Sequence, residues 1–377
     1  GQYRSSAAWW VDRLDNLHTT RSPVARPAQL QVGARHPDGS VARARAHALL
    51  SLEPSQAVRF ELFPEPPAGV PAAPVEGALS AEQIGPNFTL DSGGIAVQLS
   101  ATWTDDTVPG PLRAVRLHDG SWIGSAEMEN VPPVQALETE VTDSGPLFVR
   151  ARVRYRFEGG GNLDFIAMLV RGQDVAFIEE AFCLDEQDHL AEIWPHYAVR
   201  NSYWQAPAWV WRLAGAPDPT HVHMPAWQAK WFPRAVRDAA AFDDGPTDGG
   251  RAQQFRFPVS ACASRDIAWL FPWQTWTGKV GQWLGLYREG KEPYLGLLGL
   301  KPSAWQRPQE NLVGLLKTDE DGLALRAPLG EGSRHWAIWA GRSGEAFPKT
   351  TVQPARLQVL RNTLGSLPLE KVKHWHV

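Results

Sequence analysis

Apolar and charged residues alternate most regularly in the segment FVRARVRYRF, residues 148–157. Apolar side chains take every second position from Val149, and four arginines stand between them, which predicts a β-strand with one buried side and one basic, solvated side. The glycines of 159–161 predict a turn, after which residues 163–169 alternate again. A second turn precedes the apolar run 175–184. The pattern therefore predicts three consecutive antiparallel strands.

The same grouping of short apolar runs and glycine-containing turns recurs along the chain. Residues 283–300 and 322–341 each predict a β-hairpin, whereas 93–105 and 355–361 each predict a single strand. The 33 glycines and 31 prolines are spread throughout, as many turns between short strands require. Strands therefore dominate the prediction.

Helical signals are confined to the two ends of the chain. Residues 5–18 have a serine suited to an N-cap and apolar residues at helical spacing, and 367–377 fits the first turns of a second helix. Two segments without strand periodicity, the Pro-rich 63–82 and the acidic, Gly-rich 235–254, are interpreted as long loops.

These elements predict an all-β protein built as one large antiparallel β-sandwich. We predict a short N-terminal helical arm over residues 1–24, the sandwich over 25–362 and a C-terminal linker over 363–377. A chain of 377 residues can bury a core of that size.

Charge and hydropathy exclude several partners. Charged residues are 21% of the chain and the net charge is only −4, so no basic field would collect nucleic acid. No apolar run approaches the roughly 20 residues that span a bilayer. We therefore predict neither a nucleic-acid partner nor a membrane span.

Tryptophan is the unusual component of the composition, with 18 residues against 3 methionines. An indole ring can stack on the apolar face of a sugar, and it can equally fill the interior of a large sandwich. Both interpretations apply to Trp209 and Trp211, which share one face of a predicted strand and form either a stacking platform or part of the core.

The segments 109–129, 144–182 and 367–377 resemble the N-terminal β-sandwich region of secreted bacterial polysaccharide lyases and glycoside hydrolases. The resemblance covers about residues 90–377 and lies in strand and turn motifs rather than in catalytic ones. It implies a sandwich of the supersandwich, galactose-mutarotase-like type. It also implies a polysaccharide or oligosaccharide partner and a secreted or periplasmic location.

In proteins of that kind an (α/α) toroid follows the sandwich. This sequence ends at Val377, about where a toroid would begin, so the resemblance implies a toroid that is missing, separately encoded or cleaved away. The sequence also begins at Gly1 without an initiator methionine, which fits a removed export signal or a trimmed chain.

The segment 185–200 is the candidate for catalysis. A lyase acting on uronic acids needs a group that neutralises the carboxylate, a base and an acid, and His196, Tyr197 and Arg200 could supply all three. The alternative is an exposed acidic loop in which His196 only bonds nearby backbone. If the chain is an enzyme, a lyase is favoured over a glycoside hydrolase.

Carbohydrate binding is predicted for tryptophans in loops and for the segment 271–283, where rings stand beside uncharged hydrogen-bonding side chains. The candidates are Trp194, Trp204, Trp227, Trp273, Trp276 and Gln274.

No metal or cofactor site is predicted. His221 and His223 would point to the same side of an extended segment, as a two-histidine metal pair would, but first-row metal sites usually need three or four ligands. The sequence thus favours a carbohydrate-contacting sandwich, lyase-like or a supporting domain. The alternative is a structural or adhesive extracellular module that assembles through Trp-rich surfaces.

Overall fold

Strands make up nearly all of the described structure, a computed structural model in which one 3-10 turn, Glu158–Gly160, is the only helical element assigned. The structure describes residues 6–13, 25–48, 59–63, 77, 79–103, 107–184, 207–213, 221–225, 241–243, 254–258, 269–271, 283–287, 293–299, 314–319, 322–329 and 331–340. All strand pairs in this part of the chain are antiparallel, so the predicted all-β antiparallel sandwich is confirmed.

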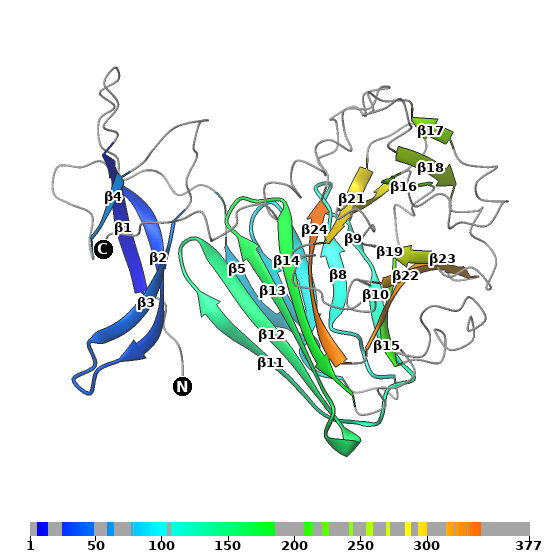
Figure 1. Cartoon of the computed structure of the whole chain (residues 1–377), viewed down its shortest axis with the longest axis horizontal. Coiled ribbons are helices and arrows are strands. Elements are labelled where there is room, and N and C mark those ends of the chain that lie inside the picture. Colours follow the sequence, from blue (N-terminus) through cyan, green and yellow to red (C-terminus); the bar gives the residue numbers. More distant parts are fainter. Residues whose placement is uncertain are drawn as a thin grey trace.

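A ten-stranded sheet forms one layer of the sandwich (Figure 1). Its strands, in spatial order, are β11 (Val134–Ser144), β12 (Phe148–Phe157), β13 (Asn162–Val170), β14 (Val175–Cys183), β24 (Glu331–Ala340), β21 (Pro293–Gly299), β20 (Trp283–Tyr287), β16 (His221–Pro225), β18 (Gln254–Pro258) and β17 (Ala241–Asp243).

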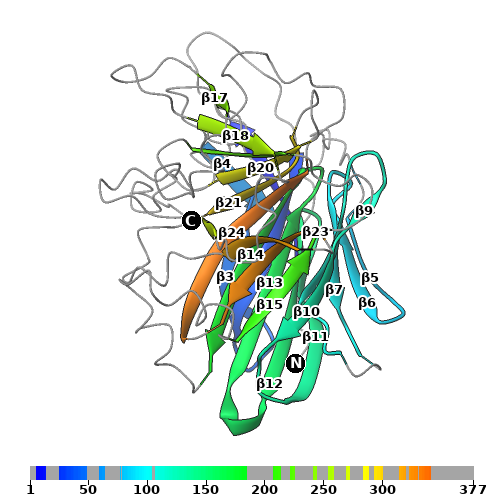
Figure 2. The same ribbon diagram turned by 90° about the vertical axis from the view of Figure 1, so that its right-hand side faces the viewer.

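Two five-stranded sheets form the facing layer (Figure 2). The first contains β5 (Ser80–Ile84), β6 (Asn87–Asp91), β7 (Ala96–Ser100), β8 (Leu112–Arg116) and β9 (Trp122–Ile123). The second contains β10 (Ser125–Glu129), β15 (Ala208–Arg212), β23 (Gly322–Pro328), β22 (Gly314–Asp319) and β19 (Trp269–Phe271). An antiparallel bridge links Pro109, in the segment before β8, to Glu127 of β10 in the other sheet.

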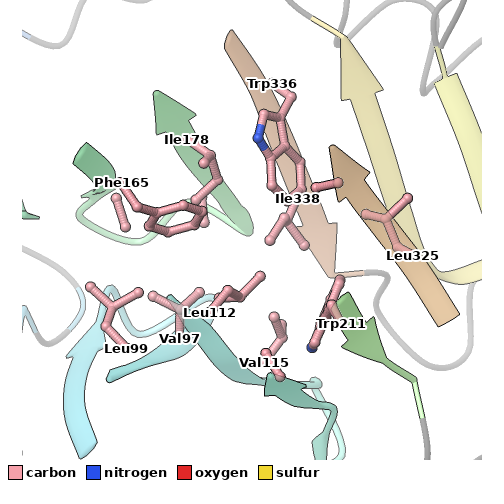
Figure 3. Close-up of a cluster of buried hydrophobic side chains, with 14 of the residues drawn as sticks. Val97, Leu99, Leu112, Val115, Phe165, Ile178, Trp211, Leu325, Trp336 and Ile338 are labelled. Carbon is pink, nitrogen blue, oxygen red and sulfur yellow. The ribbon is translucent and has the colours of Figure 1, made fainter. Parts of the chain in front are cut away.

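The hydrophobic core lies between these layers, and Figure 3 shows how it is filled. Val97, Leu99, Leu112 and Val115 of one five-stranded sheet face aliphatic and aromatic side chains of the large sheet. β12 contributes to this core as its predicted alternation requires. Its inward residues are buried, whereas the arginines between them are partly or fully exposed.

The register confirms most of the predicted pairings. β12, β13 and β14 form the predicted meander, and β20 pairs with β21 as the predicted hairpin. The single strand predicted within 93–105 is present as β7. The segment 235–254, predicted as a long loop, contains the short strand β17.

The hairpin predicted over 322–341 is wrong. β23 pairs with β15 and β22 in a five-stranded sheet, whereas β24 pairs with β14 and β21 in the ten-stranded sheet. The chain therefore crosses from one layer to the other between Pro328 and Glu331. Both strands are apolar enough to lie in a core, so their sequences fit either partner.

The predicted N-terminal helical arm is also wrong. Residues Ser6–Arg13 form strand β1, which pairs with β2 (Ala25–Arg35) and β4 (Arg59–Phe63) in a four-stranded sheet of order β3–β2–β1–β4, with β3 at Val41–His47. The contiguous run Ala7–Val11 fits a buried strand as well as a helix, because a short apolar run lacks a decisive period, and tryptophan and valine favour strands.

Two predicted elements near the C-terminal end of the sequence lie outside the described residues. They are the strand predicted at 355–361 and the helix predicted at 367–377. The predicted domain boundaries at residues 24 and 362 stay predictions.

A carboxylate with no access to solvent joins the two layers. Glu180 on β14 is 2% exposed, and its oxygens accept hydrogen bonds from Arg334 and from the indole nitrogens of Trp336, at 2.7 Å, and Trp209, at 3.0 Å. Arg334 and Trp336 are on β24 of the same sheet, whereas Trp209 is on β15 of the facing layer. The Arg334 guanidinium also lies over the Phe182 ring, 4.6 Å from its centre.

We expect Glu180→Gln to lower the free energy of unfolding by about 3 kcal/mol, because it removes the buried negative charge that pairs with Arg334. Chemical denaturation measures the loss. The control is Glu179→Gln on the same strand, whose carboxylate is 43% exposed and pairs with Arg150; it should cost less than about 1 kcal/mol. Equal losses in the two variants would show that Glu180 carries no special role.

Candidate functional site

An open cleft of about 500 Å3 lies where the four-stranded sheet approaches the ten-stranded sheet. One wall is formed by β2 and β3, through Gln31, Val32, Gly33, Arg43, Ala44 and Arg45. The other wall is the end of the β11–β12 pair, through Thr142, Asp143 and Arg150. Figure 1 shows the four-stranded sheet (blue) standing beside that part of the sandwich.

Each wall contains a β-bulge. On β2 the register with β3 shifts between Val32 and Ala34, so Gly33 is the extra residue, and on β11 it shifts between Val141 and Asp143, so Thr142 is extra. A bulge re-aims the side chains that follow it. On β11 it moves Asp143 to the outer face of the sheet, where it lies opposite Arg150 of β12.

Asp143 is the buried polar group of the cleft. Its side chain is 4% exposed and accepts a 2.9 Å hydrogen bond from the Gln31 amide of the opposite wall. Burial raises the pKa of this carboxyl, while the charge of Arg150 and the bond from Gln31 oppose the increase. The walls are thus joined by a carboxylate and an amide at the base of the cleft.

The contact between the walls is anchored by Gln29 of β2. Its side chain is fully buried, and its carbonyl oxygen accepts hydrogen bonds from the backbone amides of Leu147, at 3.1 Å, and Phe148, at 2.9 Å. The side chain fits there because residue 145 is glycine. A Cβ atom on Gly145 would lie 2.5 Å from the Gln29 amide carbon.

We expect Gly145→Ala to displace Gln29 and to weaken the docking of the four-stranded sheet. The amides of Leu147 and Phe148 should lose protection in hydrogen exchange, because each loses its acceptor. Gly33→Ala is the matched control, since a Cβ atom there makes only ordinary contacts, 3.5 Å from Arg43. Unchanged protection in Gly145→Ala would contradict this account of the docking.

His47 of β3 lies in the same contact, with its ring 5.0 Å from the ring of Phe148 in an edge-on arrangement. Burial lowers the pKa of His47, the nearby Arg45 charge lowers it further, and Asp143 acts in the opposite direction. Protonation of this imidazole is therefore harder in the folded state than in the unfolded chain.

We predict that stability falls as the pH drops through the unfolded-state pKa of His47, about 6.5. The unfolded chain binds the proton first, so acidification favours unfolding in that window. His47→Phe keeps a ring against Phe148 and removes the titration, and its denaturation midpoint should change less between about pH 7 and pH 5. Identical pH profiles for the two proteins would refute this role of His47.

The arginines of β12 do not form the basic surface that the sequence predicts. Each of the four is paired with a carboxylate. Arg152 pairs with Glu140, Arg154 with Asp164 and Arg156 with Glu138 on the adjacent strands, and Arg150 pairs with Glu179 on β14, two strands away. Hydrogen bonding to Asp164 raises the pKa of Arg154 further. The outer face of these strands is therefore close to electrically neutral.

The cleft wall on β3 is different. Arg43 and Arg45 line the cleft and are exposed, and neither forms an ion pair within the described part of the chain. Among the described residues, no carboxylate compensates their positive charge.

Every predicted site residue lies outside the described residues. This holds for the catalytic candidates His196, Tyr197 and Arg200 and for the sugar-binding candidates Trp194, Trp204, Trp227, Trp273, Trp276 and Gln274. These assignments stay predictions.

The two interpretations of Trp209 and Trp211 are separated by the structure. Both side chains are fully buried, and Trp209 packs against Trp336, with ring centres 6.3 Å apart, and edge-on against Phe165. They belong to the core and are not a stacking platform. Trp122, by contrast, is 36% exposed and lies under Arg116.

Most of the cleft is missing from the sequence prediction. The segment VARARAH, residues 41–47, has the same alternation as β12 and could have indicated a strand with Arg43 and Arg45 on one side. Nothing in the sequence marks Gln31 or Asp143, since they meet only when two sheets dock. Among the described residues no cluster of three metal-ligating side chains occurs, and no helix there is long and apolar enough to cross a membrane.

Comparisons with known proteins give matches in structure only. No family model matches the sequence, and no curated protein matches it. An α-galactosidase from Lactobacillus brevis is 12% identical with a TM-score of 0.29, over 70% of this chain and 39% of that enzyme. A GH36 α-galactosidase from Geobacillus stearothermophilus is 8% identical with a TM-score of 0.30, over 71% of this chain and 41% of that enzyme.

A galactose mutarotase related enzyme from Lactobacillus acidophilus is 7% identical with a TM-score of 0.31, over 69% of this chain and 99% of that enzyme. The chain thus spans about two fifths of the two α-galactosidases. None of these three proteins is named as a lyase. TM-scores of 0.29 to 0.31 assign no function to this chain.

Proposed function

We propose that this chain is a carbohydrate-contacting β-sandwich of a polysaccharide-degrading system and that the cleft holds the glycan. The observation that carries the proposal is the convergence of hydrogen-bonding side chains from two sheets on one cleft of about 500 Å3. Gln31 and Thr142 offer an amide and a hydroxyl, Asp143 offers acceptors, and the arginines offer donors. Sugar hydroxyls both donate and accept, so such a mixed lining suits them.

The tryptophan content supports the same proposal from the sequence side. The candidates Trp194, Trp204, Trp227, Trp273 and Trp276, with Gln274, would add stacking surfaces to the hydrogen bonds of the cleft. The proposed protein is exported by a bacterium and acts together with an (α/α) toroid. The proposed function has two forms. In the first the chain is a lyase that uses His196, Tyr197 and Arg200, and in the second it is a supporting domain without catalysis.

Calorimetric titration of the full chain with neutral and acidic oligosaccharides tests the proposal. Ala44→Trp should block binding, because Ala44 is exposed and lines the cleft, so an indole there occupies the space of the ligand. Ala42→Trp is the matched control, since Ala42 is exposed on the same strand and does not line the cleft. Binding that survives Ala44→Trp would place the glycan elsewhere.

Two further readouts separate the forms of the proposal. A rise in ultraviolet absorbance during incubation with uronate glycans would reveal the unsaturated product of a lyase, and His196→Ala should abolish it. If no glycan binds and size-exclusion chromatography shows assembly, the alternative of a structural or adhesive module takes its place.

A further inference from the structure

We infer that the cleft selects acidic glycans and that Arg43 and Arg45 bind the carboxylate or sulfate group of the sugar. The inference rests on the proposed glycan binding and adds the class of ligand and the residues that determine specificity. Its basis is the charge of the lining, which holds three guanidinium groups against one carboxylate.

The positive charges of the two walls are not equivalent. On the sandwich wall, Arg150 donates a 2.9 Å hydrogen bond to Glu179 and lies opposite Asp143 in the strand register. Its charge is therefore compensated within the protein. On the facing wall, Arg43 and Arg45 have no ion pair among the described residues, so two positive charges remain for a ligand.

The positions of the two arginines suit an extended anionic chain. They are two residues apart on β3, so their side chains leave the same side of the strand at a spacing of roughly 7 Å. A guanidinium presents a planar fork of donors that can bind both oxygens of an acidic group, and it keeps its charge at all relevant pH values.

The opposite wall fixes the orientation of the ligand. The buried Asp143 carboxylate repels an acidic group and accepts hydrogen bonds from hydroxyls, and Thr142 beside it offers a neutral hydroxyl. The acidic edge of the sugar should therefore face β3, and a hydroxyl edge should face β11. Carboxylates and sulfate esters share the chemistry that Arg43 and Arg45 recognise, so both are included in the test.

The experiment measures the affinity of the full chain for oligogalacturonate, sulfated dextran and unmodified dextran. The double variant Arg43→Gln/Arg45→Gln should weaken binding of the acidic glycans at least about tenfold and leave neutral dextran unchanged. Raising the salt concentration should weaken acidic binding to the parent chain and have little effect on the variant. Preference for one of the two acidic probes assigns carboxylate or sulfate as the group bound.

Arg152→Gln/Arg156→Gln is the control with the same change in net charge. These arginines pair with Glu140 and Glu138 on the outer face of β12 and do not line the cleft, so the affinities should stay within about twofold. An equal loss in both double variants, or equal binding of acidic and neutral glycans, overturns the inference alone. Failure of every glycan to bind overturns the proposed function and this inference with it.

Discussion

The ion pair between Glu180 and Arg334 constrains how the two layers of the sandwich can meet. A charge buried in a core is tolerated only when hydrogen bonds satisfy it, and here the donors come from β24 and from β15 of the facing layer. Sliding one layer against the other would break the bond from Trp209 to Glu180. The hydrogen bonds to the ion pair therefore fix the position of one layer relative to the other. Apolar contacts alone would tolerate other relative positions of the layers.

The same constraint explains why tryptophan fills this core. An indole offers a large apolar surface and one N–H donor, so Trp209 and Trp336 pack against each other and also bond the carboxylate. Leucine in either position would fill part of the volume and leave Glu180 short of a donor. Part of the high tryptophan content is thus a property of the interior, independent of any ligand.

The sequence predicts the elements of the fold better than their arrangement. Alternation in 148–157 and 163–169 is a local property, and the strands it predicts are present as β12 and β13. The crossing between β23 and β24 depends on which sheet each apolar strand joins, and the two residues between them do not encode that choice. Ser6–Arg13 is likewise a strand because β2 and β4 bond it on both sides, which is a tertiary effect.

The cleft shows why a charge pattern alone does not predict a site. The segments RARVRYR on β12 and VARARAH on β3 have the same alternation of arginine and apolar residues, but different strands lie beside them. β12 is an inner strand flanked by β11 and β13, whose carboxylates pair with three of its arginines. In the described part of the chain β3 is an edge strand paired with β2 alone, which places Gln31 and Ala34 opposite Arg45 and Arg43, so neither arginine has a carboxylate across from it.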